Sequence, residues 1–215
     1  TLLLEARDPD SGKALSDDEI RANILTFIAA GQETTANCIT WTLYLLSQSR
    51  EWRERVQAEA ESEWGSLDGL ADRLVVTRAV IDEANRLYPP ITAISRTALG
   101  YDELAGETIK PGTLIVIAPY VLHRHRALWT RPNAFDPNRF FGKARESIDR
   151  FAYLPFGVGP RICIGATFAI QEASIMVATI MRHFTLEMVS GSAPWPVQKV
   201  TLRPKGGLPM VVRRR

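Results

Sequence analysis

Phe156-Gly157-Val158-Gly159-Pro160-Arg161-Ile162-Cys163-Ile164-Gly165 is a segment in which three glycines and a proline surround one cysteine. Glycine permits positive φ and close backbone approach to a ligand, and proline fixes φ, so this loop holds Cys163 in place. The apolar run 166–177 predicts a helix whose positive N-terminal end lies beside Cys163 and favours a thiolate. Such a thiolate serves as a nucleophile or as a metal ligand; a buried structural cysteine is the alternative.

The composition is that of a globular chain that can bury a sizeable core, with 215 residues and 46% hydrophobic content. A net charge of +2 gives no electrostatic reason to expect nucleic-acid binding, and the basic tail 213–215 is expected to be solvated. The two cysteines, Cys38 and Cys163, form no CxxC pair, which fits a reducing compartment.

Targeting signals are absent from the sequence given. No run of eighteen apolar residues occurs, and the N-terminus lacks the order of a signal peptide. These features predict a cytoplasmic protein, although an anchor in a preceding segment is compatible with a chain that does not begin with Met.

A helix of roughly thirty residues is predicted from Asp17 to Leu46, because Ser16 and Glu19 form a capping box and apolar residues follow at helical spacing. Its middle, 29–35, is unusual for a buried helix, since Gly31 weakens it and a Thr hydroxyl competes for backbone carbonyls. A Thr34 bond to the Ala30 carbonyl is predicted to open the helix there into a notch for water or a small ligand. The alternative is an ordinary helix with Glu33 facing solvent.

The cysteine segment resembles the haem-binding loop of the cytochrome P-450 family, which it matches at Phe156, Gly157, Gly159, Arg161, Cys163 and Gly165. The segment 30–34 (Ala-Gly-Gln-Glu-Thr) is similar to the oxygen-binding signature in the family's long central helix, and it precedes the loop in the family's order. The resemblance implies that Ala30 and Gly31 leave room for the cofactor and dioxygen, and that Thr34 and Glu33 deliver protons.

Glu83 and Arg86 lie one turn apart in a helix predicted over 77–87 and ended by Pro89-Pro90. Spacing alone favours a weak surface pair. However, Glu83-Ala84-Asn85-Arg86 resembles the family's buried E-x-x-R pair, and 135–140 resembles the meander motif. The resemblance implies a structural network of Glu83, Arg86 and Arg139.

Two β-prone runs, 91–98 and 112–118, predict a small antiparallel sheet. By the resemblance, this segment borders the substrate pocket through Ile91, Thr92, Ala93 and Ile94, and Arg96 pairs with a haem propionate. An edge-strand charge is the alternative role for Arg96. His123 and His125 are interpreted as structural, because two histidines without a third ligand are weak evidence for a metal site.

Four motifs in the family's order therefore imply a mainly α fold with small antiparallel β-sheets, the C-terminal part of the cytochrome P-450 fold. The family's domain is about twice as long, so residues 1–215 are expected to be the C-terminal portion of one domain that lacks its N-terminal half. Self-association or pairing with a missing fragment is expected to cover the exposed central helix.

The implied function is haem-thiolate monooxygenation of a small apolar substrate with O2. Cys163 is the implied iron ligand of haem b; Arg161, Arg96, Phe156, Gly157 and Gly165 surround the cofactor. No His or Asn arrangement supports acyl transfer. No flavin or iron–sulfur signature occurs, so electrons are expected from a ferredoxin- or flavodoxin-type partner and its NAD(P)H reductase. The alternative is a haem-free, non-catalytic folded fragment or interaction module.

Overall fold

The computed structural model describes residues 2–189 and 194–215 and is mainly helical with small antiparallel sheets, as predicted. In chain order the helices are α1 (Leu2–Glu5), α2 (Asp17–Gln48), α3 (Arg50–Glu63), α4 (Leu70–Arg73), α5 (Val75–Leu87), α6 (Pro119–Leu122), α7 (Gly142–Glu146) and α8 (Ala166–His183). Short 3-10 turns span Pro137–Phe140 and Gly159–Arg161. The strands are β1 (Ile94–Thr97), β2 (Asp102–Leu104), β3 (Glu107–Ile109), β4 (Leu114–Ile117), β5 (Phe184–Met188), β6 (Pro196–Gln198), β7 (Leu202–Pro204) and β8 (Met210–Arg214).

Helix α2 confirms the long helix predicted from the sequence. It has 32 residues, which corresponds to about 48 Å at about 1.5 Å per residue. Its N-terminus carries the predicted capping box: the Ser16 hydroxyl accepts from the Glu19 N–H at 3.3 Å, and the Glu19 carboxylate accepts from the Ser16 N–H at 2.8 Å. These two bonds satisfy backbone donors that the helix itself leaves unpaired.

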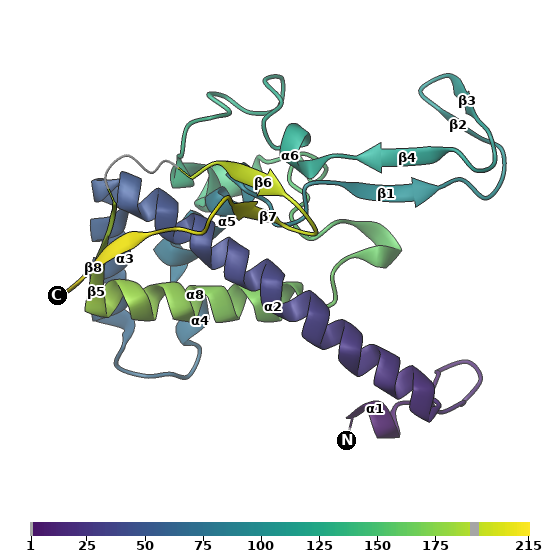
Figure 1. The fold of residues 1–215 in the computed structure, drawn as a ribbon, viewed down its shortest axis with the longest axis horizontal. Coiled ribbons are helices and arrows are strands. Elements are labelled where there is room, and N and C mark those ends of the chain that lie inside the picture. The colour runs from purple at the N-terminus through teal and green to yellow at the C-terminus, as the bar shows by residue number, and fades with distance from the viewer. Residues whose placement is uncertain (1, 190–193) are drawn as a thin grey trace.

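The core forms where the C-terminal half of α2 packs against α3, α5 and α8. Its apolar side chains interdigitate in one cluster that includes Leu46, Trp52, Val56, Val80, Ile81, Val177 and Met181. The N-terminal half of α2 has no such cover, and it extends beyond these helices (Figure 1). Four of its apolar residues, Ile24, Leu25, Phe27 and Ile28, are between 46% and 62% exposed.

Trp41 ties the C-terminal strands to the helical core. Its indole is fully buried, stacks on Tyr88 with ring centroids 4.1 Å apart, and donates from Nε1 to the Leu202 carbonyl at 2.9 Å. Leu202 begins β7, which pairs with β6. The β6–β7 hairpin is thereby held beside the middle of α2, which matters for the site described below.

The strand pair predicted from runs 91–98 and 112–118 is confirmed, because β1 and β4 pair antiparallel with Ile94 opposite Ile117. This ladder extends away from the helices and carries the β2–β3 hairpin at its far end (Figure 1). The ladder's inner end, at Ile94 and Ile117, lies at the body of the molecule and contributes to the cleft.

The basic C-terminal tail is exposed, as predicted, but it is also part of a strand pair and of two ion pairs. Arg213 and Arg214 belong to β8, which pairs with β5. Arg213 Nε lies 3.5 Å from Glu187 Oε2, and Arg215 Nη1 lies 3.1 Å from Glu61 Oε1. The backbone of the tail pairs with β5, and this pairing brings the Arg213 side chain close to the Glu187 carboxylate.

The described part of the chain lacks two kinds of feature. None of its helices combines the length and the apolar character needed to cross a membrane. Within residues 2–189 and 194–215, no three or more His, Cys, Asp and Glu side chains gather in a way that could hold a metal ion.

Candidate functional site

A cleft of about 1380 Å³ opens between the middle of α2, the cysteine loop, the start of α8 and the inner end of β1. Single drug-sized ligands usually occupy roughly 300–1,000 Å³, so this cleft has room for a large group and a second molecule. It is lined by every residue that the sequence predicts for catalysis or cofactor binding, namely Ala30, Gly31, Glu33, Thr34, Arg96, Phe156, Gly157, Arg161, Cys163 and Gly165.

The cysteine loop takes the shape that its glycines allow. Gly157 and Gly159 have φ values of +74° and +76°, a region that other residues enter at a cost. The Cys163 N–H donates to the Phe156 carbonyl at 3.0 Å and closes the loop, while the Cys163 side chain is exposed to the cleft. The loop therefore presents the thiol without burying it.

Helix α8 begins at Ala166, three residues after Cys163, as predicted. The Ala166 N–H donates to the Cys163 carbonyl at 3.4 Å, so the thiol lies at the positive end of an 18-residue helix. A Cβ at Gly165 would meet the Cys163 sulfur at 3.9 Å, so a larger side chain there would press on the space beside the thiol.

Thr34, on the α2 wall of the cleft, makes the predicted bond within its own helix: its hydroxyl donates to the Ala30 carbonyl at 2.8 Å. The predicted opening of the helix does not follow, because α2 is continuous across these residues. A carbonyl oxygen has two lone pairs, so Ala30 can accept from the hydroxyl and retain its helical partner. Gly31 is exposed to the cleft, and a Cβ there would meet nothing within 4 Å.

Glu33 is held by a partner that the sequence does not reveal. The Thr201 hydroxyl donates to Glu33 Oε1 at 2.7 Å and accepts from Asn37 Nδ2 at 2.9 Å. Thr201 is 1% exposed and Asn37 is 9% exposed, so a buried amide and hydroxyl fix one oxygen of a half-buried carboxylate at the cleft. Glu33 therefore does not simply face solvent.

The structure brings Glu83, Arg86 and Arg139 together beneath the cleft. Arg86 donates to both oxygens of Glu83, at 2.6 and 2.8 Å, and both side chains are 0% exposed. Arg139 Nε lies 3.5 Å from Glu83 Oε1, an ion-pair contact without a hydrogen bond. Burial raises the pKa of Glu83, and the bonds from Arg86 oppose this rise.

Three further bonds join Arg86 to the chain after α6. Its guanidinium donates to the carbonyls of His123 and Pro132, each at 2.7 Å, and to that of Ala134 at 3.1 Å. The Asp136 N–H donates to Glu83 at 2.9 Å. The pair thus organises the segment that leads into the meander motif.

The predicted substrate-facing segment is only partly in the cleft. Ile91 and Ile94 line it, but the structure does not place Thr92 and Ala93 in its wall. The Thr92 hydroxyl instead donates to Gln198 Oε1 at 2.8 Å, which turns this side chain toward β6. Other apolar lining residues carry no signal in a single sequence; these are Phe27, Ile117, Leu154, Val158, Ile164, Phe168, Ile170 and Val200.

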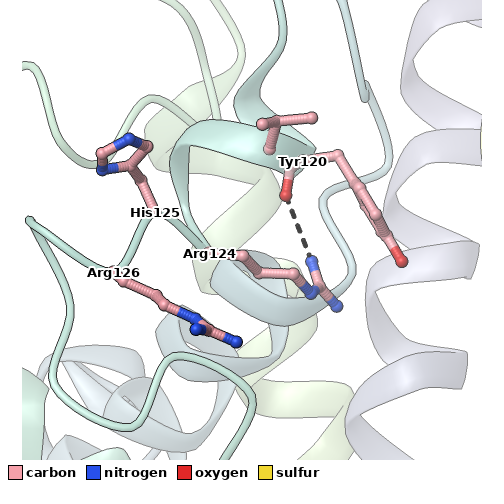
Figure 2. Close-up of a pocket in the computed structure, with 5 residues that line it drawn as sticks. Tyr120, Arg124, His125 and Arg126 are labelled. Carbon is pink, nitrogen blue, oxygen red and sulfur yellow. Dashed lines mark hydrogen bonds between the residues drawn. The ribbon is translucent and has the colours of Figure 1, made fainter.

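A second, smaller pocket of about 450 Å³ is lined by Tyr120, Val121, Arg124, His125 and Arg126. Figure 2 shows that Arg124 lies beside Tyr120, to whose carbonyl it donates at 3.4 Å. The guanidinium lies 4.0 Å from the Tyr120 ring centroid. The pocket contains none of the predicted site residues, so it is not the candidate site.

The lining of the large cleft fits a haem group held by a thiolate. An exposed thiol faces an apolar cleft, and two exposed arginines, Arg96 and Arg161, lie on its rim. Neither arginine forms an ion pair within the described part of the chain, so both are free to meet anionic groups. Thiolate ligation at a helix N-terminus and arginines for carboxylates are the donor set that such a cofactor needs.

Comparisons with known proteins agree with this geometry. The family model described as Cytochrome P-450 matches residues 1–210. The chain is 36% identical to cyclooctatin synthase of Streptomyces melanosporofaciens over 96% of its own length and 46% of that protein. It is 39% identical to cyclooctat-9-en-7-ol 5-monooxygenase of the same organism over 88% of its length and 42% of that protein.

Among solved structures, a crystal structure of the cytochrome P-450DA heme domain superposes with a TM-score of 0.92 at 34% identity. The match covers 100% of this chain and 49% of that chain. The chain thus spans about half the length of the curated relatives and structures that it matches.

Proposed function

Because this chain belongs to the cytochrome P-450 family, we propose that it carries the haem-thiolate machinery of a monooxygenase. The enzyme inserts one oxygen atom of O2 into an apolar organic substrate. The observation that carries the proposal is the cleft in which Cys163 lies on one wall and Ala30, Gly31, Glu33 and Thr34 lie on another. The motif order supports the assignment of residues 1–215 to the C-terminal portion of a single domain.

Cys163 would hold haem b through its sulfur, and Arg161 and Arg96 would pair with the propionates. Phe156, Gly157 and Gly165 line the cleft and would contact the cofactor, and Gly157 has the positive φ that the loop requires. The bound haem supplies the oxidising chemistry. The loop that carries Cys163 leads directly into the N-terminal end of α8, which begins at Ala166.

On the wall of the cleft opposite Cys163, residues of α2 leave open volume and can take part in proton transfer. Gly31 leaves open volume next to the cleft, since a Cβ at this position would meet no described residue outside its own stretch of helix within 4 Å. The Thr34 hydroxyl donates a hydrogen bond to the Ala30 carbonyl, so its oxygen can accept from a water molecule that keeps its second O–H for the cleft. Thr201 donates only to Oε1 of Glu33, so Oε2 is available to replace the proton that this water gives up.

Substrate and electrons come from outside the chain. Ile91 and Ile94 give the cleft an apolar wall, which suits a small apolar substrate. Members of the family receive electrons from redox partners, and we propose a ferredoxin- or flavodoxin-type protein with its NAD(P)H reductase. The cytoplasmic location expected from the sequence stays a prediction.

The function can be tested with isotopically labelled oxygen. The chain is loaded with haem, supplied with a reduced ferredoxin or flavodoxin, and incubated with apolar test compounds under 18O2. Mass spectrometry is expected to find one labelled oxygen atom in the product. Product that carries oxygen from water would contradict monooxygenation. A folded chain that binds no haem and gives no product would favour the haem-free, non-catalytic alternative.

Thr34→Ala is expected to lower the ratio of product formed to electrons consumed by about a hundredfold, the lower end of usual general acid–base contributions. The substitution removes the hydroxyl that positions water. The measurement compares NAD(P)H consumption, hydrogen peroxide release and product. Thr34→Ser keeps the hydroxyl and serves as the matched control. Unchanged coupling in Thr34→Ala would remove Thr34 from proton delivery.

We also propose that the exposed half of α2 is covered by self-association or by a further fragment of the protein. Leu25 and Ile28 are 61% and 62% exposed on this helix and do not line the cleft. Light scattering is expected to show a species larger than 24 kDa. Leu25→Ser with Ile28→Ser is expected to shift it toward the monomer. A monodisperse monomer of the unaltered chain would count against self-association.

A further inference from the structure

His123 is a buried histidine that the proposed chemistry does not use. It follows α6, its residue is 0% exposed, and its ring lies 5.2 Å from the ring of Tyr153. The other histidine of this segment, His125, is exposed. Buried polar groups are nearly always hydrogen-bonded, so the partners of this ring indicate its role.

Two hydrogen bonds connect His123 to two different parts of the site. Its Nε2 accepts from the Leu154 backbone N–H at 2.8 Å, and its carbonyl accepts from Arg86 Nη1 at 2.7 Å. Leu154 stands just before the cysteine loop, and Arg86 belongs to the buried pair with Glu83. One residue thus joins the buried ion pair to the loop entrance.

Backbone hydrogen bonds couple the position of Leu154 to that of Cys163. The Leu154 carbonyl accepts from the Gly157 N–H at 3.3 Å, and the Phe156 carbonyl accepts from the Cys163 N–H at 3.0 Å. Leu154 itself is 6% exposed and lines the cleft. A shift of Leu154 would therefore move the residues that frame the thiol.

We propose that His123 is a positioning residue that fixes the Cys163 loop relative to the Glu83–Arg86 pair, and that it does so only as the neutral imidazole. A backbone N–H can only donate, so the ring nitrogen that faces Leu154 must carry no proton. The proposed function gives this loop its importance, because the loop would hold the thiolate that binds the metal. The anchoring of the loop by His123 does not itself depend on haem.

The surroundings of His123 keep its ring neutral. The Arg86 guanidinium of α5 donates to the His123 carbonyl and pairs with Glu83, Tyr153 beside the ring donates to Asp82, and Arg124 lies next in the chain. Burial, Arg86 and Arg124 lower the pKa of His123 from 6.5 to about 4, although the backbones of Arg86 and Asn85 slightly favour the charged ring. Within the described residues, His123 Nδ1 is buried and has no hydrogen-bond partner.

This shift fixes the direction of the pH effect. Since the pKa in the folded chain is below that in the unfolded chain, the unfolded chain binds more protons between pH 6.5 and about 4. The contribution of His123 to stability is fully present above pH 6.5 and is lost as the pH falls through this window. The loop anchored by Leu154 is expected to loosen first.

Amide hydrogen exchange of the chain without haem tests the anchoring directly. His123→Phe keeps the aromatic volume beside Tyr153 and removes the acceptor. It is expected to speed exchange at Leu154, Gly157 and Cys163 at least about tenfold more than at Val177, which lies in the core helix α8. His123→Asn, whose amide oxygen can accept, is expected to restore part of the protection. Equal acceleration at all four amides would mean a merely structural role and overturn the proposal.

A second measurement needs no variant, in case His123→Phe does not fold. In the unaltered chain, NMR is expected to show that His123 titrates below pH 5 and that Leu154 loses protection in the same step. Titration of the ring near pH 6.5, or a Leu154 amide indifferent to that step, would overturn the proposal. If this pattern holds but haem does not bind through Cys163, the proposed function fails while the anchoring role of His123 stands.

Discussion

Arg86→Met is expected to lower the free energy of unfolding by about 3–5 kcal/mol, because it leaves a buried carboxylate without its cation. Glu83 is 0% exposed and receives two bonds from Arg86. The carbonyls of His123, Pro132 and Ala134 would also lose their donor. Domains of ordinary stability have about 5–15 kcal/mol in total, so the variant would be close to unfolded. Urea unfolding followed by circular dichroism measures the loss.

Two further variants make this result specific. Arg21→Gln breaks an ion pair whose arginine and aspartate side chains are 73% and 92% exposed, and it is expected to cost below about 1 kcal/mol. Glu83→Leu combined with Arg86→Met is expected to recover part of the loss, since the buried carboxylate is removed together with its main cation and only the weaker Arg139 contact is lost. A loss for Arg86→Met as small as that for Arg21→Gln would show that the buried pair does not organise the fold.

Cys163→Ala is expected to reduce haem affinity at least about tenfold, which corresponds to about 1.4 kcal/mol, and to leave the fold intact. The side chain is exposed, so its removal creates no cavity in the core. Absorbance titration with haem measures the affinity, and thermal unfolding of the haem-free variant checks the fold. If Cys163→Ala lost both the fold and haem affinity, this would contradict the claim that Cys163 binds haem without supporting the fold.

The second cysteine of the same cleft provides the matched control. Cys38 also lines the cleft but is 7% exposed, and burial raises its pKa to about 12. Its thiol is therefore protonated near neutral pH and is a poor ligand. Cys38→Ala is expected to keep haem affinity within a factor of about two while costing about 1 kcal/mol of stability. Equal losses of haem affinity in both variants would argue against a specific ligand.

Features set by neighbours in the chain could be predicted from the sequence. The capping box of Ser16 and Glu19 is local chemistry, and it placed the start of α2 correctly. The glycines of the cysteine loop imply positive φ, which Gly157 and Gly159 adopt. The end of α5 at Leu87 follows from the prolines after it.

Features that depend on distant segments could not be predicted in this way. Thr201 lies 168 residues after Glu33, and no spacing marks the pair. The bonds of His123 to Leu154 and of Trp41 to Leu202 are likewise long-range. Strand pairing, not composition, decides that the C-terminal arginines join β8. Such contacts follow from how the elements pack, which a single sequence does not specify.

Carbon monoxide binding to the ferrous, haem-loaded chain tests the central claim most directly, because the position of the Soret band reports the ligand on the other face of the iron. The assignment of Cys163 predicts the red-shifted Soret band of thiolate ligation in the unaltered chain and in Cys38→Ala, and its absence in Cys163→Ala. Bound haem without that band, or a red-shifted band that survives in Cys163→Ala, would contradict Cys163 as the iron ligand.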